Sequence, residues 1–163
     1  MKIVDSNINH FQHAIRLAKL AEKEGNLPIG AVITLDGKVI AEGRNAIWSP
    51  KLNPNRHAEV EALRNVPQEL WGHSRDMILY TTLEPCVMCL GAILLHRIGR
   101  VMFGSADGYG GAGLLIGHMP TYFEEAIART EWIGPAYPQG CAPLYARVMK
   151  LVEQWRAQET QDE

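Results

Sequence analysis

The spacing of apolar residues divides the chain into alternating predicted helices and strands. Between about residues 7 and 24, apolar side chains recur every three or four positions, and Gly25 follows directly, which predicts a first amphipathic helix. Residues 28–43 contain two β-branched runs on either side of Asp36 and Gly37, a dipeptide that favours a tight hairpin turn. The pattern therefore predicts one helix followed by two antiparallel strands.

The rest of the chain continues this alternation. Short apolar segments predict further strands at residues 77–82, 100–104 and 128–134, and helical spacing predicts helices at residues 57–66, 86–96 and 144–155. Strands that alternate with helices favour parallel pairing, with the helices packed on the sheet. The glycine-rich segment 104–125 is predicted to be a long functional loop.

Composition and charge limit the class of protein. The 163 residues are 47% hydrophobic and 21% charged, so we expect one domain over residues 1–157 and a polar tail at 158–163. The formal charge of -2 gives no general attraction to phosphate backbones. No apolar run approaches the roughly 20 residues of a membrane span, and the first ten residues are too polar for a signal peptide. We therefore expect a cytoplasmic protein without a membrane partner.

Two of the three cysteines, Cys86 and Cys89, stand three positions apart at the predicted start of a helix. With Pro85 in the first turn, both sulfurs would share one helical face, where the helix dipole favours thiolates. Taken alone, the pair fits metal ligands, a redox pair or buried core cysteines equally well. The Glu-Pro pair before it differs from thioredoxin-like motifs, which disfavours the redox interpretation. Cys141 is expected to be a core residue.

His57 is the candidate third ligand, because Glu59 follows it at the start of a helix predicted to lie beside the cysteine helix. The combination of His-x-Glu with Pro-Cys-x-x-Cys matches the signature of zinc-dependent nucleobase deaminases. Glu61 and the other five histidines are interpreted as ordinary surface or core residues.

This set of residue types suits one kind of chemistry. One imidazole and two thiolates leave one position of a tetrahedral zinc ion open, which is typical of a catalytic site. Zinc lowers the pKa of a bound water to around neutrality, and Glu59 is placed to carry the protons. The alternative is a non-catalytic zinc-stabilised binding module. It is disfavoured because a structural site is expected to have a fourth protein ligand, and Glu59 would then have no task.

Residues 27–107 resemble the cytidine deaminase-like superfamily, within it the branch of bacterial tRNA adenosine deaminases and guanine deaminases. The segments that carry the similarity are LPIGAVI, EGRN, HAEVEALR, LYTTLEPCVMCLGAI and RIGRVMFG. The resemblance implies an α/β fold, a three-layer α/β/α sandwich with a mixed five-stranded central sheet. It also implies one Zn2+ per chain bound by His57, Cys86 and Cys89, with Glu59 as proton shuttle, and a homodimer whose interface includes residues near the cysteine helix.

Four further residues are candidate substrate contacts. The resemblance implies that Asn45 contacts the substrate, and Ala58, Asp107 and Tyr109 are predicted to lie at the same pocket. Tyr109 has a planar side chain that can stack on a base or close the pocket over it. Packing at a dimer interface is the alternative role for Tyr109.

The composition of the loop at residues 105–111 favours one class of substrate over another. Where tRNA-acting members of the family typically carry an arginine and a lysine, this chain has Ala106 and Tyr109, and the loop contains no cation. Cationic contacts supply much of the affinity for nucleic acid. We therefore favour hydrolytic deamination of a small nucleobase or nucleoside, a purine such as adenine, adenosine or guanine. A tRNA-specific adenosine deaminase acting at the anticodon wobble position is the alternative.

Overall fold

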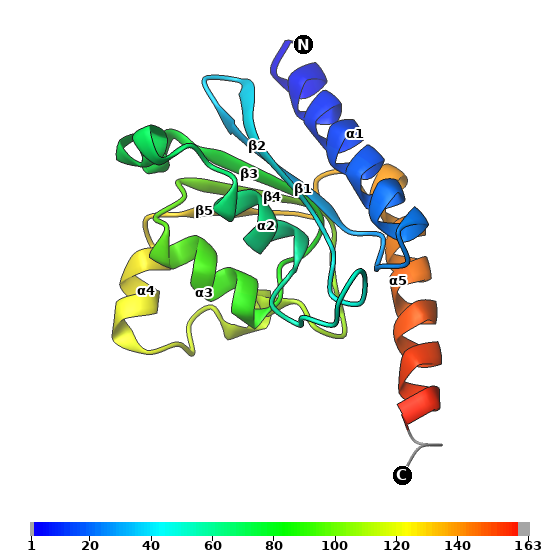
Figure 1. Ribbon diagram of the computed structural model, residues 1–163. Coiled ribbons are helices and arrows are strands. Elements are labelled where there is room, and N and C mark those ends of the chain that lie inside the picture. Colours follow the sequence, from blue (N-terminus) through cyan, green and yellow to red (C-terminus); the bar gives the residue numbers. More distant parts are fainter. Residues whose placement is uncertain (1, 160–163) are drawn as a thin grey trace.

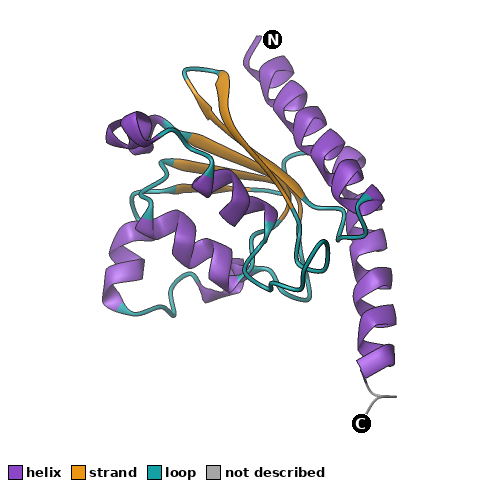
Figure 2. Ribbon diagram, viewed as in Figure 1, coloured by secondary structure: helices purple, strands orange, loops and turns teal. Residues whose placement is uncertain are grey.

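Five strands form one mixed sheet that lies between two layers of helices (Figures 1 and 2). The computed structural model describes residues 2–159. The strands are β1 (Gly30–Leu35), β2 (Lys38–Arg44), β3 (Ile78–Leu83), β4 (Arg100–Ser105) and β5 (Glu131–Ile133). The helices are α1 (Lys2–Lys23), α2 (Ala58–Arg64), α3 (Val87–Leu95), α4 (Thr121–Ile127) and α5 (Pro138–Glu159), with short 3-10 helices η1 (Gln68–Asp76) and η2 (Ala112–Leu115).

The strand order is β2-β1-β3-β4-β5, and it confirms the predicted three-layer α/β/α sandwich. β1 pairs antiparallel with both β2 and β3, whereas β3, β4 and β5 run parallel to one another. Helices α1 and α5 cover one face, and α2 and α3 cover the other, with α4 packed beside α3 (Figure 1). In the parallel half of the sheet, α3 connects β3 to β4 and α4 connects β4 to β5, because parallel neighbours need a crossover connection and cannot be joined by a tight turn.

The apolar pattern places a core on each face of the sheet. On the α2 and α3 side, the buried core includes Ile33, Leu63, Leu79, Ile93 and Val101. On the α1 and α5 side, the core is built from Phe11, Leu17, Val32, Tyr80, Met102 and Cys141. Cys141 is therefore a core residue, as the sequence predicts.

The predicted hairpin turn at Asp36 and Gly37 and the predicted end of the first helix at Gly25 are both confirmed. Asp36 and Gly37 have φ values of 51° and 76°, which are the left-handed conformations of a tight hairpin turn. Gly25, at φ 87°, ends the first helix, and the Asn26 N–H donates to the Ala21 carbonyl at 2.9 Å.

Other boundaries differ from the prediction. Helix α1 begins at Lys2, ahead of the predicted start near residue 7, since no glycine or proline interrupts the intervening residues. Segment 104–125, predicted to be an irregular loop, contains η2 and most of α4. Residues 158 and 159 continue α5, and the remainder of the predicted polar tail lies outside the described residues. Within residues 2–159, no helix combines the length and apolar character needed to span a bilayer.

Candidate metal centre and active site

The first turns of α2 and α3 bring the three predicted ligands together. His57 is the residue immediately before α2, and Cys86 is the residue immediately before α3. Both have extended backbones, with φ near -73°. Pro85, predicted in the first turn of α3, instead precedes the helix, so that Cys86 caps it and Cys89 lies in its first turn. The two sulfurs therefore approach the imidazole from a loop position and a helical position.

The distances within this group fit a zinc ion. The Nδ1 atom of His57 lies 3.5 Å from the sulfur of Cys86 and 3.5 Å from that of Cys89. The three donor atoms all lie within 4.8 Å of one another. A tetrahedral zinc ion with its usual bonds to nitrogen and sulfur separates such atoms by about 3.6 Å. The three residues are thus positioned as a potential zinc site that leaves one coordination position for a non-protein ligand.

Glu59 lies directly beside this site and is 3% exposed. The Thr81 hydroxyl donates a hydrogen bond of 2.9 Å to its Oε1 atom, and the Cys89 thiol lies 3.4 Å from its Oε2 atom. Burial is the largest influence on the carboxyl group and raises the pKa of Glu59, although the nearby His57 acts in the opposite direction. A carboxyl group whose pKa is raised in this way is suited to gaining and losing a proton near neutral pH.

The pKa values of the Cys86 and Cys89 thiols are shifted in opposite directions. Cys86 accepts a hydrogen bond from Cys89, which together with the His57 contact lowers the pKa of Cys86 to about 4. The same hydrogen bond, and burial, raise the pKa of Cys89. Burial lowers the pKa of His57, but its hydrogen bond to Cys86 and the charges of Glu59 and Cys86 outweigh this and raise it. These contacts therefore favour the thiolate form of Cys86, which is the form that binds a metal ion.

A cavity of about 140 Å³ opens onto this group. His57, Glu59 and Cys86 form part of its wall, and Leu27, Ile29, Leu83, Val148, Met149 and Val152 supply an apolar lining. This volume is below the range of pockets for drug-sized ligands, so the cavity matches a ligand of few atoms. The three lining residues from α5 could not be assigned to the site from the sequence, because their helical spacing is that of ordinary core positions.

Glu84 is a residue of the site that the sequence did not reveal. Its Oε2 atom accepts a 3.0 Å hydrogen bond from the Asp107 backbone N–H, and its Oε1 atom accepts one of 3.0 Å from the Gly113 N–H. A side chain at Gly111 would collide with the Glu84 carboxylate, so glycine is required at this close approach. Glu84 therefore fixes the loop after β4 against the start of α3. The Glu-Pro pair before Cys86 was the available signal for it.

Asp107 and Tyr109, the other two candidate substrate contacts, both line the cavity. Asp107 Oδ1 accepts hydrogen bonds from the N–H groups of Tyr109 and Gly110 and from the Tyr145 hydroxyl, at 2.9–3.0 Å. These bonds organise the loop. Tyr109 is 62% exposed, and the Arg156 guanidinium lies 6.0 Å from its ring centroid and donates to its hydroxyl.

Asn45 and Ala58 are both fully buried, and neither is among the residues that line the cavity. The Asn45 side-chain oxygen accepts a 3.3 Å hydrogen bond from the Ile47 N–H. Within residues 2–159 its Nδ2 atom has no hydrogen-bond partner. The Asn45 backbone N–H donates to the carbonyl of Ile29, which does line the cavity. A buried donor without a partner is costly in the protein alone, so it favours a role in binding a ligand.

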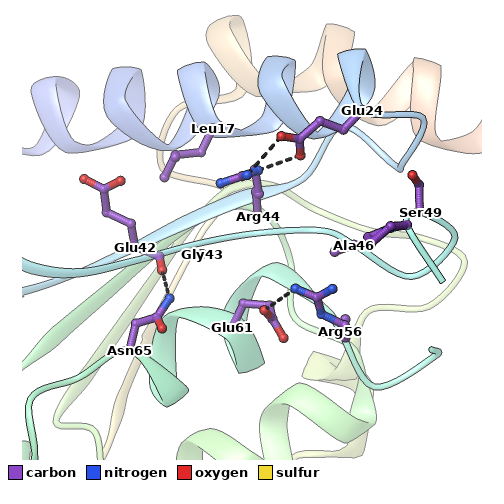
Figure 3. A pocket seen from close by; sticks show the side chains of 11 residues that line it. Leu17, Glu24, Glu42, Gly43, Arg44, Ala46, Ser49, Arg56, Glu61 and Asn65 are labelled. Atoms are coloured by element: carbon purple, nitrogen blue, oxygen red, sulfur yellow. Dashed lines mark hydrogen bonds and ion pairs between the residues drawn. The ribbon is translucent and has the colours of Figure 1, made fainter. Parts of the chain in front are cut away.

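A larger cavity, of about 550 Å³, lies elsewhere, between α1, β2 and α2 (Figure 3). Its charged side chains face one another. Arg44 forms two hydrogen bonds with Glu24, at 2.7 and 2.9 Å, and Arg56 forms one of 3.0 Å with Glu61 (Figure 3). The cavity beside the metal-ligand group is therefore the smaller of these two.

The fold and the group formed by His57, Glu59, Cys86 and Cys89 together define a metal-dependent α/β protein of the deaminase type. The family described as "Cytidine and deoxycytidylate deaminase zinc-binding region" matches residues 5–105. Because this match covers more than half of the chain, the protein belongs to that family.

Relatives in this family carry more specific names. A tRNA-specific adenosine deaminase of Buchnera aphidicola (subsp. Baizongia pistaciae) is 43% identical over 104 residues, which are 62% of this chain and 62% of that protein. The match thus spans about three fifths of that relative. A structure from a study of A-to-I editing by tRNA:A34 deaminases is 37% identical, with a TM-score of 0.62 over 70% of this chain and 90% of the other. A guanine deaminase of Bacillus subtilis is 34% identical, with a TM-score of 0.56 over 69% and 76%.

Proposed function

We propose that this protein is a zinc-dependent hydrolytic deaminase that converts adenosine to inosine in transfer RNA. The observation that carries the deaminase assignment is the buried Glu59 carboxyl group, which is redundant as a ligand and lies 3.4 Å from the Cys89 sulfur. Support for the substrate comes from bacterial relatives 38–43% identical to this chain that are named tRNA-specific adenosine deaminases. This support reverses the order of preference that the sequence alone suggested.

The residues of the site have distinct roles in this proposal. His57, Cys86 and Cys89 would bind zinc, which when bound makes water a nucleophile at neutral pH. Glu59 takes a proton from the attacking water and delivers it to a ring nitrogen of the base. Water adds to the carbon that bears the exocyclic amino group and leaves a hydroxyl group on it. Glu59 then takes the proton of this hydroxyl and passes it to the amino group, which leaves as ammonia while the carbon becomes a carbonyl.

The neighbours of Glu59 prepare it for this exchange. The Thr81 hydroxyl holds Oε1 at 2.9 Å and so leaves Oε2 directed toward the cysteine sulfur. The apolar wall of the cavity excludes bulk water and keeps the pKa of Glu59 raised. The unpartnered Nδ2 of Asn45 supplies a donor for the substrate. A cavity of about 140 Å³ suits a single base that has been flipped out of its stack.

A second candidate function is deamination of a free purine base or nucleoside. The observation that favours it is the loop of residues 105–111, which contains no lysine or arginine beside the cavity. The likeness to a guanine deaminase at 34% identity is a further reason to test it.

One pair of assays separates the two functions. Inosine formation would be measured on a tRNA transcript with adenosine at the wobble position, with a guanosine-substituted transcript as control. Ammonia release would be measured in parallel on adenine, adenosine and guanine. We expect inosine in the first transcript only, and little release from the small substrates. Turnover of a small purine without inosine formation would establish the second function, and the absence of both would reject the deaminase proposal.

We also propose that the protein acts as a homodimer in the cytoplasm. Apolar side chains on α3 and on the segment before α4 are exposed, namely Val87 at 63%, Leu95 at 59% and Leu114 at 86%. An apolar groove of about 280 Å³ lies between these elements. Such surfaces favour burial against a partner. Sedimentation at micromolar concentration should give twice the chain mass of 18.2 kDa, and Leu114→Asp should lower it.

A further inference from the structure

Three arginines from three separate elements line one cavity of about 250 Å³ at the far end of α3. Arg75 belongs to the last turn of η1, Arg97 follows the end of α3, and Arg129 follows the end of α4. Helix α3 spans nine residues, so this cavity lies about 14 Å along the helix axis from the cysteines. We infer that this cavity is a binding site for a phosphate group, separate from the deaminase site and independent of the function proposed above.

The charges in this cavity are not balanced by the protein. Within residues 2–159, none of the six ion pairs involves Arg75, Arg97 or Arg129. Glu125 is the one carboxylate among the lining residues. The carbonyl ends of α3 and α4 each contribute about half a negative charge. Three guanidinium groups therefore leave about one positive charge without a counterpart.

The arginines also affect one another. Arg75 donates a 3.1 Å hydrogen bond to the Arg129 carbonyl, which fixes its side chain at the end of α4. Burial, and then the charges of Arg97 and Arg129, lower the pKa of Arg75, while Tyr122 acts in the opposite direction. Like charges that converge on one cavity favour an anion between them. Guanidinium groups bind phosphate oxygens through paired hydrogen bonds, which makes phosphate the matching anion.

The backbone conformation of Arg97 independently indicates that its side chain has a function. Arg97 has a φ of 61°, a conformation that favours glycine. Its N–H donates to the Leu94 carbonyl at 3.0 Å, and the Ile98 N–H donates to the Ile93 carbonyl at 3.3 Å. This is the helix-ending arrangement in which glycine is the usual residue. An arginine at this position is unfavourable for the backbone, whereas its charge contributes to the cavity.

The same backbone geometry supplies a variant that separates binding from folding. Arg97→Gly removes the charge and suits the positive φ, so its unfolding temperature should equal or exceed that of the native chain. Arg97→Lys keeps the charge but loses the paired hydrogen bonds. Arg16→Gln removes an exposed cation on α1, on the opposite face of the sheet, and serves as the matched control for net charge.

Binding of inorganic phosphate would be measured by calorimetry on the zinc-loaded protein. The ionic strength is held constant with chloride, and zinc content is determined before and after. We expect saturable binding at one site per chain, unchanged in Arg16→Gln and about tenfold weaker in Arg97→Gly, since one charge-assisted pair of hydrogen bonds is lost. Arg129→Gln should weaken binding similarly. No saturable binding by the native chain, or equal affinity in Arg97→Gly, would overturn the inference.

A second arm identifies the source of the phosphate group. A labelled single-stranded RNA would be titrated into the native chain and Arg97→Gly, with inorganic phosphate as competitor. Weaker RNA binding by Arg97→Gly, together with competition by phosphate, assigns the site to an RNA backbone. Equal RNA binding by both chains, with phosphate binding lost only in the variant, assigns it to a small phosphate compound. Deaminase activity does not enter either arm, so failure of the proposed function and failure of this site are distinguishable.

Discussion

Two cavities of this protein differ in how their polar groups are partnered. At the smaller one, about 140 Å³ in volume, potential metal ligands lack a full set of partners within the chain. At the larger one, about 550 Å³, charged side chains form ion pairs with one another. Three potential metal ligands converge at the small cavity, and Asn45, whose backbone N–H donates to the cavity-lining Ile29, has an unpartnered side-chain N–H. In the large cavity, Arg44 is paired with Glu24 and Arg56 with Glu61 (Figure 3).

This difference shows why volume is a poor guide to function here. A paired surface charge is already stabilised within the chain and gains little from a ligand. A buried donor or thiolate without a full set of partners gains much more, because its desolvation has not been offset. The two cavities share helix α2, which contributes Glu59 to one and Glu61 to the other. Matched substitutions on the same helix can therefore test the contrast.

The largest expected effect separates Glu59 from Glu61. Glu59→Gln should lower turnover by about 10²–10⁴-fold, because an amide of nearly the same shape cannot carry a proton. Zinc content and the circular dichroism spectrum should not change. Glu61→Gln loses only its bonds to Arg56 and Arg64, and should keep turnover within about threefold. Equal activity in Glu59→Gln and the native chain would refute the role of Glu59, and loss of zinc would make it a ligand.

The next effect separates Cys89 from Cys141, both of which are fully buried. Cys89→Ala should lose zinc and about 3 kcal/mol or more of stability, which lowers the unfolding temperature by about 6–12 °C. Cys141→Ala should retain zinc and lose about 1 kcal/mol, as for an ordinary core truncation. Metal analysis and thermal unfolding measure both. Full zinc occupancy in Cys89→Ala would contradict the ligand assignment.

Burial also predicts different reactivity for Cys141. Its pKa is raised to about 12, so at pH 8 almost none of it is the reactive thiolate. In the folded, zinc-loaded chain Cys141 should therefore resist a thiol reagent that modifies it fully after unfolding. Rapid modification of Cys141 in the native protein would show that the core opens near α5.

A smaller effect concerns two asparagines. Asn45→Ala should lower kcat/KM by about tenfold if its Nδ2 donates to the substrate. Asn65→Ala, at the large cavity, removes only a 2.9 Å hydrogen bond to the Glu42 carbonyl and should leave kcat/KM unchanged. Thermal unfolding of both variants corrects for any loss of folding. An unchanged kcat/KM in Asn45→Ala would leave Asn45 with a purely structural role.

The sequence specified the chemistry of the small cavity better than its shape. His57, Glu59, Cys86 and Cys89 could be grouped because their spacing places each at the start of a helix, and helix starts are signalled locally. The lining from Val148, Met149 and Val152 could not be predicted, since only the docking of α5 on the sheet brings these residues to the cavity. Local signals carry no information about which face of a distant helix meets the site.

Local signals also account for part of the fold. The hairpin at Asp36 and Gly37 and the end of α1 at Gly25 were predictable because single dipeptides or glycines set the backbone there. The antiparallel pairing of β1 with β3 depends on contacts between residues 44 to 50 apart along the chain, and the alternation of elements alone favoured parallel strands. The segment 104–125 predicts a loop because glycines recur over residues 104–117, and the glycine-free stretch that forms α4 is only seven residues long.

The smallest effect tests the statement that the charges of the large cavity are satisfied within the chain. Arg44 and Glu24 are 41% and 40% exposed, and they form a bidentate pair that lowers the pKa of Glu24. Because solvent screens such a pair, a double-mutant cycle with Arg44→Gln and Glu24→Gln should give a coupling of about 0.2–1 kcal/mol. The coupling should shrink further in about 1 M salt, and no single variant should lower the unfolding temperature by more than about 4 °C. A coupling above about 2 kcal/mol that persists in high salt would show that this cavity is drier than its exposure implies. Its charges would then resemble those beside Glu59, and the contrast between the two cavities would no longer hold.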